Sequence, residues 1–323
     1  MWASSDGCER LSVEEAMRTD DMPLIPALPV SARDAMEIHG AIGGAVAPAG
    51  WQGRKDGPVY RLGPGPAVLN LTYLGNDTMA TIENVFAIIE GAEEPDRYVI
   101  LGNHRDAWTF GASDPNSGTA AMIETGSTEW VEENQEMLSS RAVAYLNIDV
   151  SVVDPGFLPS TTPQLDKLLQ EITKVVLRLG DGGSDYSAFA QHAGIPSMNI
   201  VFGEGPGYPV YHSLYDDYVW MAKFGDPGFR RHVAAASIWG MMALRLANDE
   251  IIPFNYMSYA SELEAYTKVL ENGLKGTTVT CSPLYNSIKD LRTAATKANN
   301  EQKEYFVYLY PAVKTCKLAC LAL

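Results

Sequence analysis

Basic residues are scarce in this chain of 323 residues: 24 lysines and arginines stand against 40 aspartates and glutamates, and the formal net charge is −16. A surface that binds nucleic acid is basic, so this balance argues against a nucleic-acid partner. Cysteine is also scarce, at four residues, with neither a CxxC pair nor a zinc-finger spacing. We therefore expect neither a disulfide framework nor a cysteine-based metal site.

Long apolar runs are missing as well. No run of about 18 apolar residues occurs, which excludes an obvious transmembrane helix. Residues 1–15 lack the basic start and apolar stretch of a signal peptide. The tail at 305–323 is apolar, but Pro311, Lys314 and Lys317 interrupt it, so we expect no spanning helix there.

The first third of the chain changes character near residue 66. Residues 1–66 are rich in Pro, Gly and Ala and predict loops with one short helix near 31–38. Segments 67–75 and 80–91 fit an antiparallel hairpin. The continuously apolar run at 98–101 is typical of a central parallel strand.

The rest of the chain alternates between helical and strand-like segments, which favours an α/β sandwich. Further strands are expected at 141–150 and 195–203, and helices at 117–125, 127–138, 162–179 and 185–192. Three helical segments then follow at 228–247, 256–274 and 282–299. They predict an appended helical domain or a dimerisation element.

Four candidate metal ligands follow apolar runs. His104 and Asp114 come after the run at 98–101, Asp149 comes after 142–148, and His212 lies in YPVYHSLYDD. Strands of α/β proteins present ligands at their carboxyl ends. Two histidines and two aspartates suit zinc, which accepts nitrogen and oxygen ligands.

Each candidate also has a structural alternative. A histidine after a strand is often a hydrogen-bonded structural residue, and this interpretation is kept for the three remaining histidines, His39, His192 and His232. Asp114 is suited to an Asx-turn or to the N-cap of the helix expected at Ser117, and such a role is compatible with metal binding. Asp106 is either a carboxylate that orients the His104 imidazole or a solvated loop charge.

Two other polar clusters are less specific. The pair Glu132-Glu133 lies in an amphipathic helical run and is interpreted as a solvated face rather than as a general base. Ser184 and Asp185 open a helix after a glycine-rich turn. They are placed either to bind a carboxylate or phosphate at the helix N-terminus or to cap that helix.

Several long motifs occur in a familiar order: YVILGNHRDAWTFGASDPNSG, GSTEWVEEN, AYLNID, GGSDYSAF, GIPS and YPVYHSLYDDY. On these motifs the chain resembles the glutamate carboxypeptidase II group of the M28 zinc peptidases, especially its plant members of the altered-meristem-program type. The non-enzymatic transferrin receptor shares this architecture. The resemblance implies an incomplete αβα peptidase sandwich at 76–249, a remnant of the apical, protease-associated domain at 1–75, and a helical dimerisation domain at 250–323.

The resemblance also implies roles for individual residues. His104 and Asp149 would hold one zinc ion, Asp114 would bridge to a second, and His212 would hold that second ion. Tyr211, Ser184 and Asp185 would contact the substrate. The reaction would be metal-assisted peptide hydrolysis with a glutamate as general base.

The sequence departs from the family pattern where that base is expected. The family carries a Glu-Glu pair shortly before GSTEWVEEN, the first a general base and the second a zinc ligand. Here Glu124 runs directly into Thr125, so the pair and the strand before it are absent. No catalytic residue is therefore assigned, the second zinc site is one ligand short, and the sheet should have a gap. The segment 200–208 also lacks the arginines that grip an acidic side chain in the animal enzyme.

We therefore expect a zinc-dependent carboxypeptidase by family, impaired in this chain, that acts on peptides and dimerises through its C-terminal helices. The alternatives are a non-catalytic dimeric binding or scaffold protein and a truncated splice product. Family members are usually type II membrane proteins, whereas no transmembrane segment is expected in this chain.

Overall fold

The computed structural model describes residues 12–19, 25, 27–53, 55–75, 81, 85–121, 130–131, 134–180, 183–203 and 208–320, with only the backbone for 306–320. The chain divides into two compact units, Met1–Ile82 and Glu83–Leu323. Each unit is described by itself.

The first unit contains α1 (Val13–Ala16), α2 (Ala32–Ala41) and a 3-10 turn at Ala49–Trp51. The side chain of Ser31 accepts a hydrogen bond from the Asp34 backbone N–H at 3.1 Å and so caps α2. The short helix predicted near 31–38 is confirmed.

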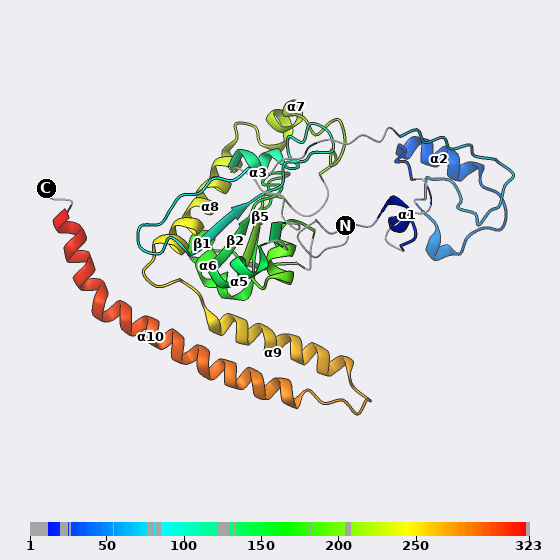
Figure 1. The fold of residues 1–323 in the computed structure, drawn as a ribbon. Coiled ribbons are helices and arrows are strands. Elements are labelled where there is room, and N and C mark those ends of the chain that lie inside the picture. Colours follow the sequence, from blue (N-terminus) through cyan, green and yellow to red (C-terminus); the bar gives the residue numbers. More distant parts are fainter. Residues whose placement is uncertain are drawn as a thin grey trace. The chain divides into compact units, whose positions relative to one another are not determined.

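The second unit is built on a five-stranded sheet in the order β1-β2-β5-β3-β4 (Figure 1). The strands are β1 (Tyr98–Gly102), β2 (Ala142–Asn147), β3 (Leu158–Thr161), β4 (Leu177–Arg178) and β5 (Ser197–Val201). β1, β2 and β5 are parallel, while β3 runs antiparallel to β5 and parallel to β4. The strands predicted at 98–101, 141–150 and 195–203 are confirmed.

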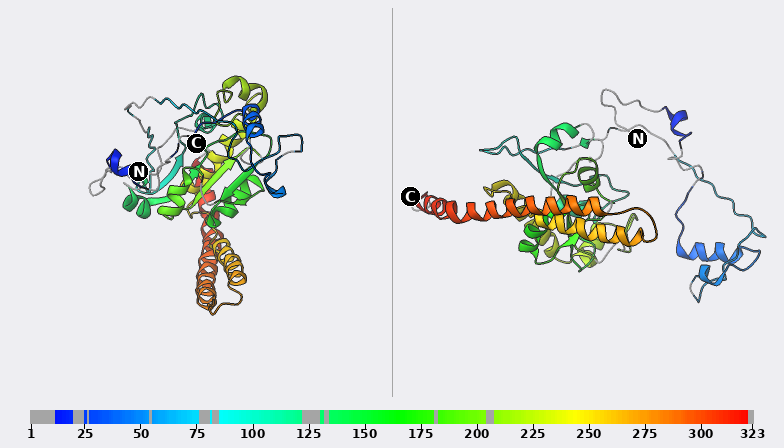
Figure 2. Two further views of the ribbon diagram at one scale, coloured as in Figure 1. Left: turned by 90° about the vertical axis from the view of Figure 1, so that its right-hand side faces the viewer. Right: turned by 90° about the horizontal axis from the view of Figure 1, so that it is seen from below.

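Helices surround this sheet and extend from it. They are α3 (Asn116–Ala121), α5 (Gln135–Arg141), α6 (Asp166–Thr173), α7 (Tyr218–Trp220), α8 (Arg230–Asn248), α9 (Tyr256–Gly273) and α10 (Ser282–Cys320), with short helical turns at 163–165, 188–192 and 221–225. α9 and α10 lie side by side as a hairpin (Figure 2). Among the described helices, none is both long and apolar enough to cross a membrane.

The side chains of β2 alternate between the two faces of the sheet, and each face has its own core. Ala144, Leu146 and Ile148 pack with α6 and α8 around Trp239, whereas Tyr145 packs on the opposite face. This arrangement, with helices on both faces, confirms the mixed α/β class. The apical and dimerisation domains remain predictions.

The hairpin predicted from 67–75 and 80–91 is wrong for the described residues. Neither 67–75 nor 85–91 forms a strand, and part of the expected turn, at 76–80, lies outside the described residues. Val68 and Ile89 are almost fully exposed. An apolar strand-like pattern becomes a strand only when a neighbour accepts its backbone hydrogen bonds, and β1 ends the sheet without a described partner on its outer side.

The single helix predicted at 162–179 is also wrong. The segment contains a 3-10 turn, then α6, and then β4. Lys174 ends α6 in the left-handed conformation with φ 67°, and the Thr173 hydroxyl donates to the Val175 carbonyl at 2.5 Å. The helical spacing of apolar residues continues past Lys174 in the sequence. Val176 belongs to that pattern, yet it packs against the core from outside the helix.

Gly118 allows α3 to approach the end of β2 closely. A Cβ atom at this position would overlap the carbonyl oxygens of Ile148 and Asp149. We expect Gly118→Ala to lower the free energy of unfolding by about 1–3 kcal/mol, the usual cost of overpacking. Urea unfolding would measure this change. Gly240→Ala, in a helix with open space at the added atom, is the control and should be neutral or stabilising.

Candidate metal centre

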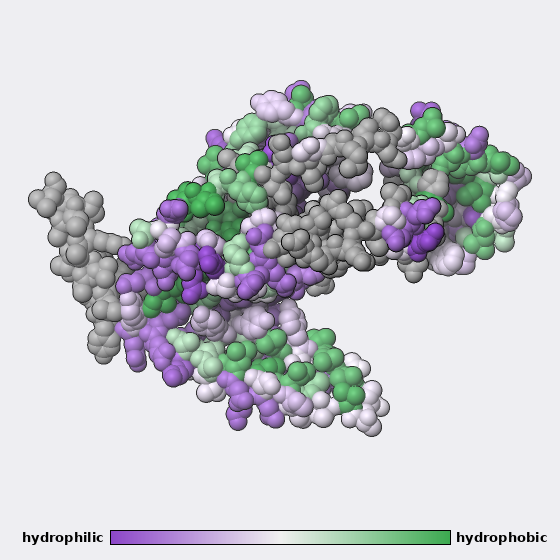
Figure 3. All heavy atoms as spheres, in the orientation of Figure 1, coloured by the Kyte–Doolittle hydropathy of each residue, from purple (hydrophilic) through white to green (hydrophobic). Residues whose placement is uncertain are grey.

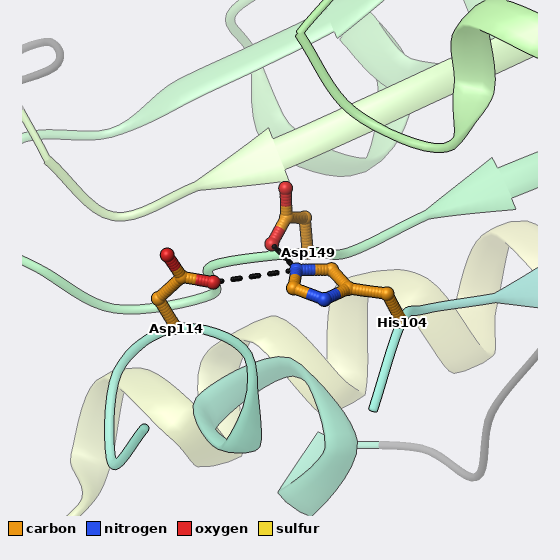
Figure 4. Close-up of side chains that lie close together, drawn as sticks. All are labelled: His104, Asp114 and Asp149. Atoms are coloured by element: carbon orange, nitrogen blue, oxygen red, sulfur yellow. Dashed lines mark hydrogen bonds and ion pairs between the residues drawn. The ribbon is translucent and has the colours of Figure 1, made fainter. Parts of the chain in front are cut away.

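The carboxyl ends of β1 and β2 bring three candidate ligands together. His104 follows β1, Asp149 follows β2, and Asp114 lies on the loop that leads into α3 (Figure 4). Because β1 and β2 are parallel neighbours, their ends meet at one edge of the sheet. The three side chains point toward one another, with all ligand atoms within 4.8 Å.

Asp114 lies between two histidines. Its Oδ1 is 3.3 Å from His104 Nε2, and its Oδ2 is 3.0 Å from His212 Nε2. Asp149 Oδ1 is 2.8 Å from the same His104 nitrogen. Only 8% of the Asp114 side chain is exposed, so little water competes for its oxygens. The structure thus gathers all four residues that the sequence predicted as ligands, with Asp114 central.

The other nitrogen of His104 faces Asp106. His104 Nδ1 is 3.1 Å from both the backbone carbonyl and Oδ1 of Asp106. A proton on Nδ1 would be donated to these oxygens, which leaves the Nε2 lone pair for a metal ion. This is the contact expected of the orienting carboxylate predicted at Asp106.

The carboxylates around His104 hold a proton on its ring. Burial lowers the pKa of His104, but the hydrogen bonds to Asp114 and Asp149 and the charges of Asp149 and Asp185 outweigh it, raising the pKa to about 11. Protonation of His104 therefore stabilises the metal-free fold. This stabilisation is complete below pH 6.5, the ordinary pKa of histidine, and it is lost as pH rises through about 11.

A metal ion must displace this proton. Between pH 6.5 and 11 we expect zinc binding to release about one proton from His104, and the apparent affinity to rise about tenfold per pH unit. Calorimetry in buffers of different ionisation enthalpy would count the protons. In His104→Gln the release assigned to His104 should disappear. A wild-type protein that releases no proton in this range would contradict the prediction.

Sequence reasoning missed Asp216, which fixes the loop that carries Asp114. The buried Asp216 carboxylate accepts the backbone N–H groups of Ser113 at 2.7 Å and of Asp114 at 3.1 Å. Burial is the largest cause that raises the pKa of Asp216. In the sequence, Asp216 is simply an aspartate four residues after His212. Nothing in that motif predicts that it bonds to the distant loop of Asp114.

The three predicted substrate-binding residues, Tyr211, Ser184 and Asp185, differ in their contacts. Burial, and then the charges of Asp114 and Asp149, raise the pKa of Tyr211, so its hydroxyl stays protonated. Ser184 Oγ accepts a hydrogen bond from Asn147 Nδ2 at 2.9 Å. Asp185 acts on His104 through its charge. None of these contacts tests a role in substrate binding.

Zinc fits the first ligand group. His104, Asp114 and Asp149 supply three ligands of the types and number that catalytic zinc sites use. His212 Nε2 faces the second oxygen of Asp114 next to this group. Among the described residues, no other group of three such side chains gathers. Glu124 and the Glu132-Glu133 pair lie outside the described residues.

His232 confirms a structural interpretation made from the sequence. Its Nδ1 lies 2.8 Å from Asp226 Oδ2, and the same oxygen accepts the backbone N–H groups of Arg231 and His232. This carboxylate therefore satisfies the N-terminus of α8 rather than a metal ion.

Comparison with known proteins adds independent information. The chain is 51% identical to "Probable glutamate carboxypeptidase LAMP1" of Arabidopsis thaliana over 94% of this chain and 51% of that protein. It is 41% identical to "Probable glutamate carboxypeptidase VP8" of Zea mays over 94% of this chain and 50% of that protein. The first alignment spans 356 positions, more than the 323 residues of this chain, so the relative has residues that this chain lacks.

No family model matches the chain. Among solved structures, a zinc aminopeptidase from Bacillus subtilis matches at 17% identity with a TM-score of 0.40, over 51% of each chain. The chain spans about half the length of the curated relatives it matches. Over nearly all of its own length, the chain is therefore similar to plant proteins named as probable glutamate carboxypeptidases.

Proposed function

We propose that this chain carries the zinc-binding centre of a carboxypeptidase that removes C-terminal residues from peptides. The observation that carries the proposal is Asp114, whose two oxygens face histidines from different loops, His104 and His212. A carboxylate with one oxygen toward each imidazole is the arrangement that two neighbouring metal ions would share. His104, Asp114 and Asp149 would hold the first ion, and Asp114 and His212 the second.

Zinc bound there would polarise a peptide carbonyl and lower the pKa of a bound water. The chain's own residues would orient the ligands and the substrate. Asp106 fixes the His104 ring, and Asp216 fixes the backbone of Asp114. The protonated hydroxyl of Tyr211 is available to donate a hydrogen bond to a substrate oxygen. Ser184 and Asp185 would contact the terminal carboxylate region of the substrate.

We further propose that hydrolysis by this chain is impaired. The Glu-Glu pair that the family resemblance leads us to expect is missing, and the alignment with the Arabidopsis relative is longer than the chain itself. Without a general base a hydrolase typically loses 10²–10⁴ in rate. The second ion would also have one protein ligand fewer than the usual three.

The proposed domains are an apical remnant at 1–75, a peptidase core at 76–249 and dimerisation helices at 250–323. Apolar side chains on the α9–α10 hairpin support dimerisation (Figure 3), with Val269, Leu270, Val279 and Leu284 all exposed. A second copy that packed on this surface would remove it from water. Membrane anchoring, as in the family, remains a proposal for the whole protein.

A non-catalytic, dimeric binding or scaffold protein is the second candidate. Among the described residues, Asp114 is the one carboxylate that faces His212, and this small ligand set favours the scaffold. A scaffold, however, needs no cluster of carboxylates and imidazoles around the buried Asp114.

Zinc content and peptide hydrolysis, measured on the same purified chain, test the proposal. We expect at least one tightly bound zinc ion and slow, chelator-sensitive release of the C-terminal residue from an N-acyl dipeptide. The same dipeptide with an amidated C-terminus should not be hydrolysed. A chain with bound zinc and no turnover would favour the scaffold, and a chain without zinc would contradict both the metal site and the peptidase proposal.

A further inference from the structure

The backbone and ring of His212 are held in an unusual way. Its φ angle is 55°, in the left-handed region that residues other than glycine rarely adopt. Its Nε2 faces Asp114 Oδ2 at 3.0 Å. Within the described part of the chain, no hydrogen bond fixes its Nδ1, whereas the corresponding nitrogen of His104 faces Asp106 at 3.1 Å.

Two aromatic rings stack on the His212 imidazole instead. The Tyr211 ring stacks on it with centroids 3.7 Å apart and an interplanar angle of 20°. The Trp108 indole stacks on it at 4.8 Å and 17°. Both rings lie within about 20° of the imidazole plane, so each favours this orientation of the imidazole.

Trp108 is 76% exposed, which is unusual for the largest apolar side chain. Among the described residues, the one aromatic ring that Trp108 contacts is the His212 imidazole. The loop that carries it is tied to the His212 loop, because the Thr109 hydroxyl donates to the Ser213 carbonyl at 2.7 Å. This hydrogen bond joins the loop after β1 to the loop before α7 close to the stack, and the bonds from Asp216 to Ser113 and Asp114 join the same two loops nearby.

We propose that Trp108 is a positioning residue that holds the His212 ring in the plane required to bind a metal ion. Metal-ligating histidines usually obtain this orientation from a hydrogen bond to their other nitrogen. Ring stacking takes that part at His212. The inference rests on the proposed metal site, and it matters most there because the second ion has few protein ligands to restrain it.

The test compares Trp108→Leu, which removes the ring, with Trp108→Phe, which keeps a ring able to stack. Trp51→Leu is the matched control, since Trp51 is also exposed and lies in the other unit. The first measurement is the NMR chemical shift of the His212 ring C–H groups in the metal-free protein, assigned with His212→Gln. Stacked rings shift these signals upfield. The shift should decrease in Trp108→Leu, where only Tyr211 still stacks on His212, and it should stay close to its wild-type size in Trp108→Phe and Trp51→Leu.

The second measurement is the affinity for successive Co²⁺ ions. Trp108→Leu should bind the second ion about 10–100-fold more weakly, the usual effect of losing a partner that orients a ligand. Its affinity for the first ion should be unchanged, and Trp108→Phe should recover most of the loss. Equal second-ion affinity in wild type and Trp108→Leu would overturn the inference. A wild type that binds one ion only would also overturn it, whereas a wild type that binds none would contradict the proposed metal site itself.

Discussion

Asp114→Asn should weaken zinc binding by more than about 100-fold and should do so for both ions at once. Loss of a partner that only orients a ligand already costs about 10–100-fold, and Asp114 offers one oxygen toward each of two histidines. An amide in its place presents a neutral oxygen on one side and a nitrogen without a lone pair on the other. Titration against a coloured chelator would give both affinities.

The fold should survive this change, because Asp216 holds the Asp114 loop through backbone N–H groups that the substitution leaves in place. Circular dichroism would check it. Asp154→Asn is the matched control: it removes the same charge from an exposed position on the chain that follows Asp149, and it should leave zinc binding unchanged. Two ions bound normally by Asp114→Asn would show that this carboxylate does not bridge them.

Restoring the segment expected between Glu124 and Thr125 should raise peptide hydrolysis by about 10²–10⁴, the range that general-base catalysis contributes. The donor would be the Arabidopsis relative, which has residues that this chain lacks. The added Glu-Glu pair would supply a base and a third protein ligand for the second ion. Rates on an N-acyl dipeptide, with and without the inserted segment, measure the gain.

The control for this experiment is the same insertion with both glutamates changed to glutamine. It adds the same length of chain without carboxylates, so it separates the chemistry of the pair from any effect on folding. We expect it to stay near the rate of the unmodified chain. If the unmodified chain already hydrolyses the dipeptide as fast as the restored one, another residue serves as its base.

The sequence was sufficient where local pattern and tertiary setting agree. The apolar run before His104 is a strand because β2 pairs with it, and Ser31 starts a helix through its own side chain. Parallel pairing then brings the candidate ligands to one edge, as the strand-end argument predicts. His104 and Asp149 lie together for this reason, while Asp114 and His212 join them from loops.

The sequence was insufficient where the outcome depends on distant partners. Lys174 ends a helix in a conformation that its own residue type does not predict. Residues 67–75 have the pattern of a strand, but no described neighbour pairs with them. Asp216 bonds to the loop of Asp114, and Trp108 stacks on His212, across about 100 positions of sequence, as the separation of 103 between Ser113 and Asp216 illustrates. A single sequence does not indicate which residues will meet across so many positions.

The outer side of β1 has a consequence for how substrate binding is measured. No described strand pairs with that side, and unpaired backbone groups at a sheet edge accept extended peptides of many sequences. A peptidase assay supplies extended peptides in excess. Peptide retention would then report two populations, one at the metal centre and one along β1, and only the first should disappear when zinc is removed. Binding that survives chelation would then be assigned to the side of β1 that has no described partner, and it should be subtracted before any specificity is assigned.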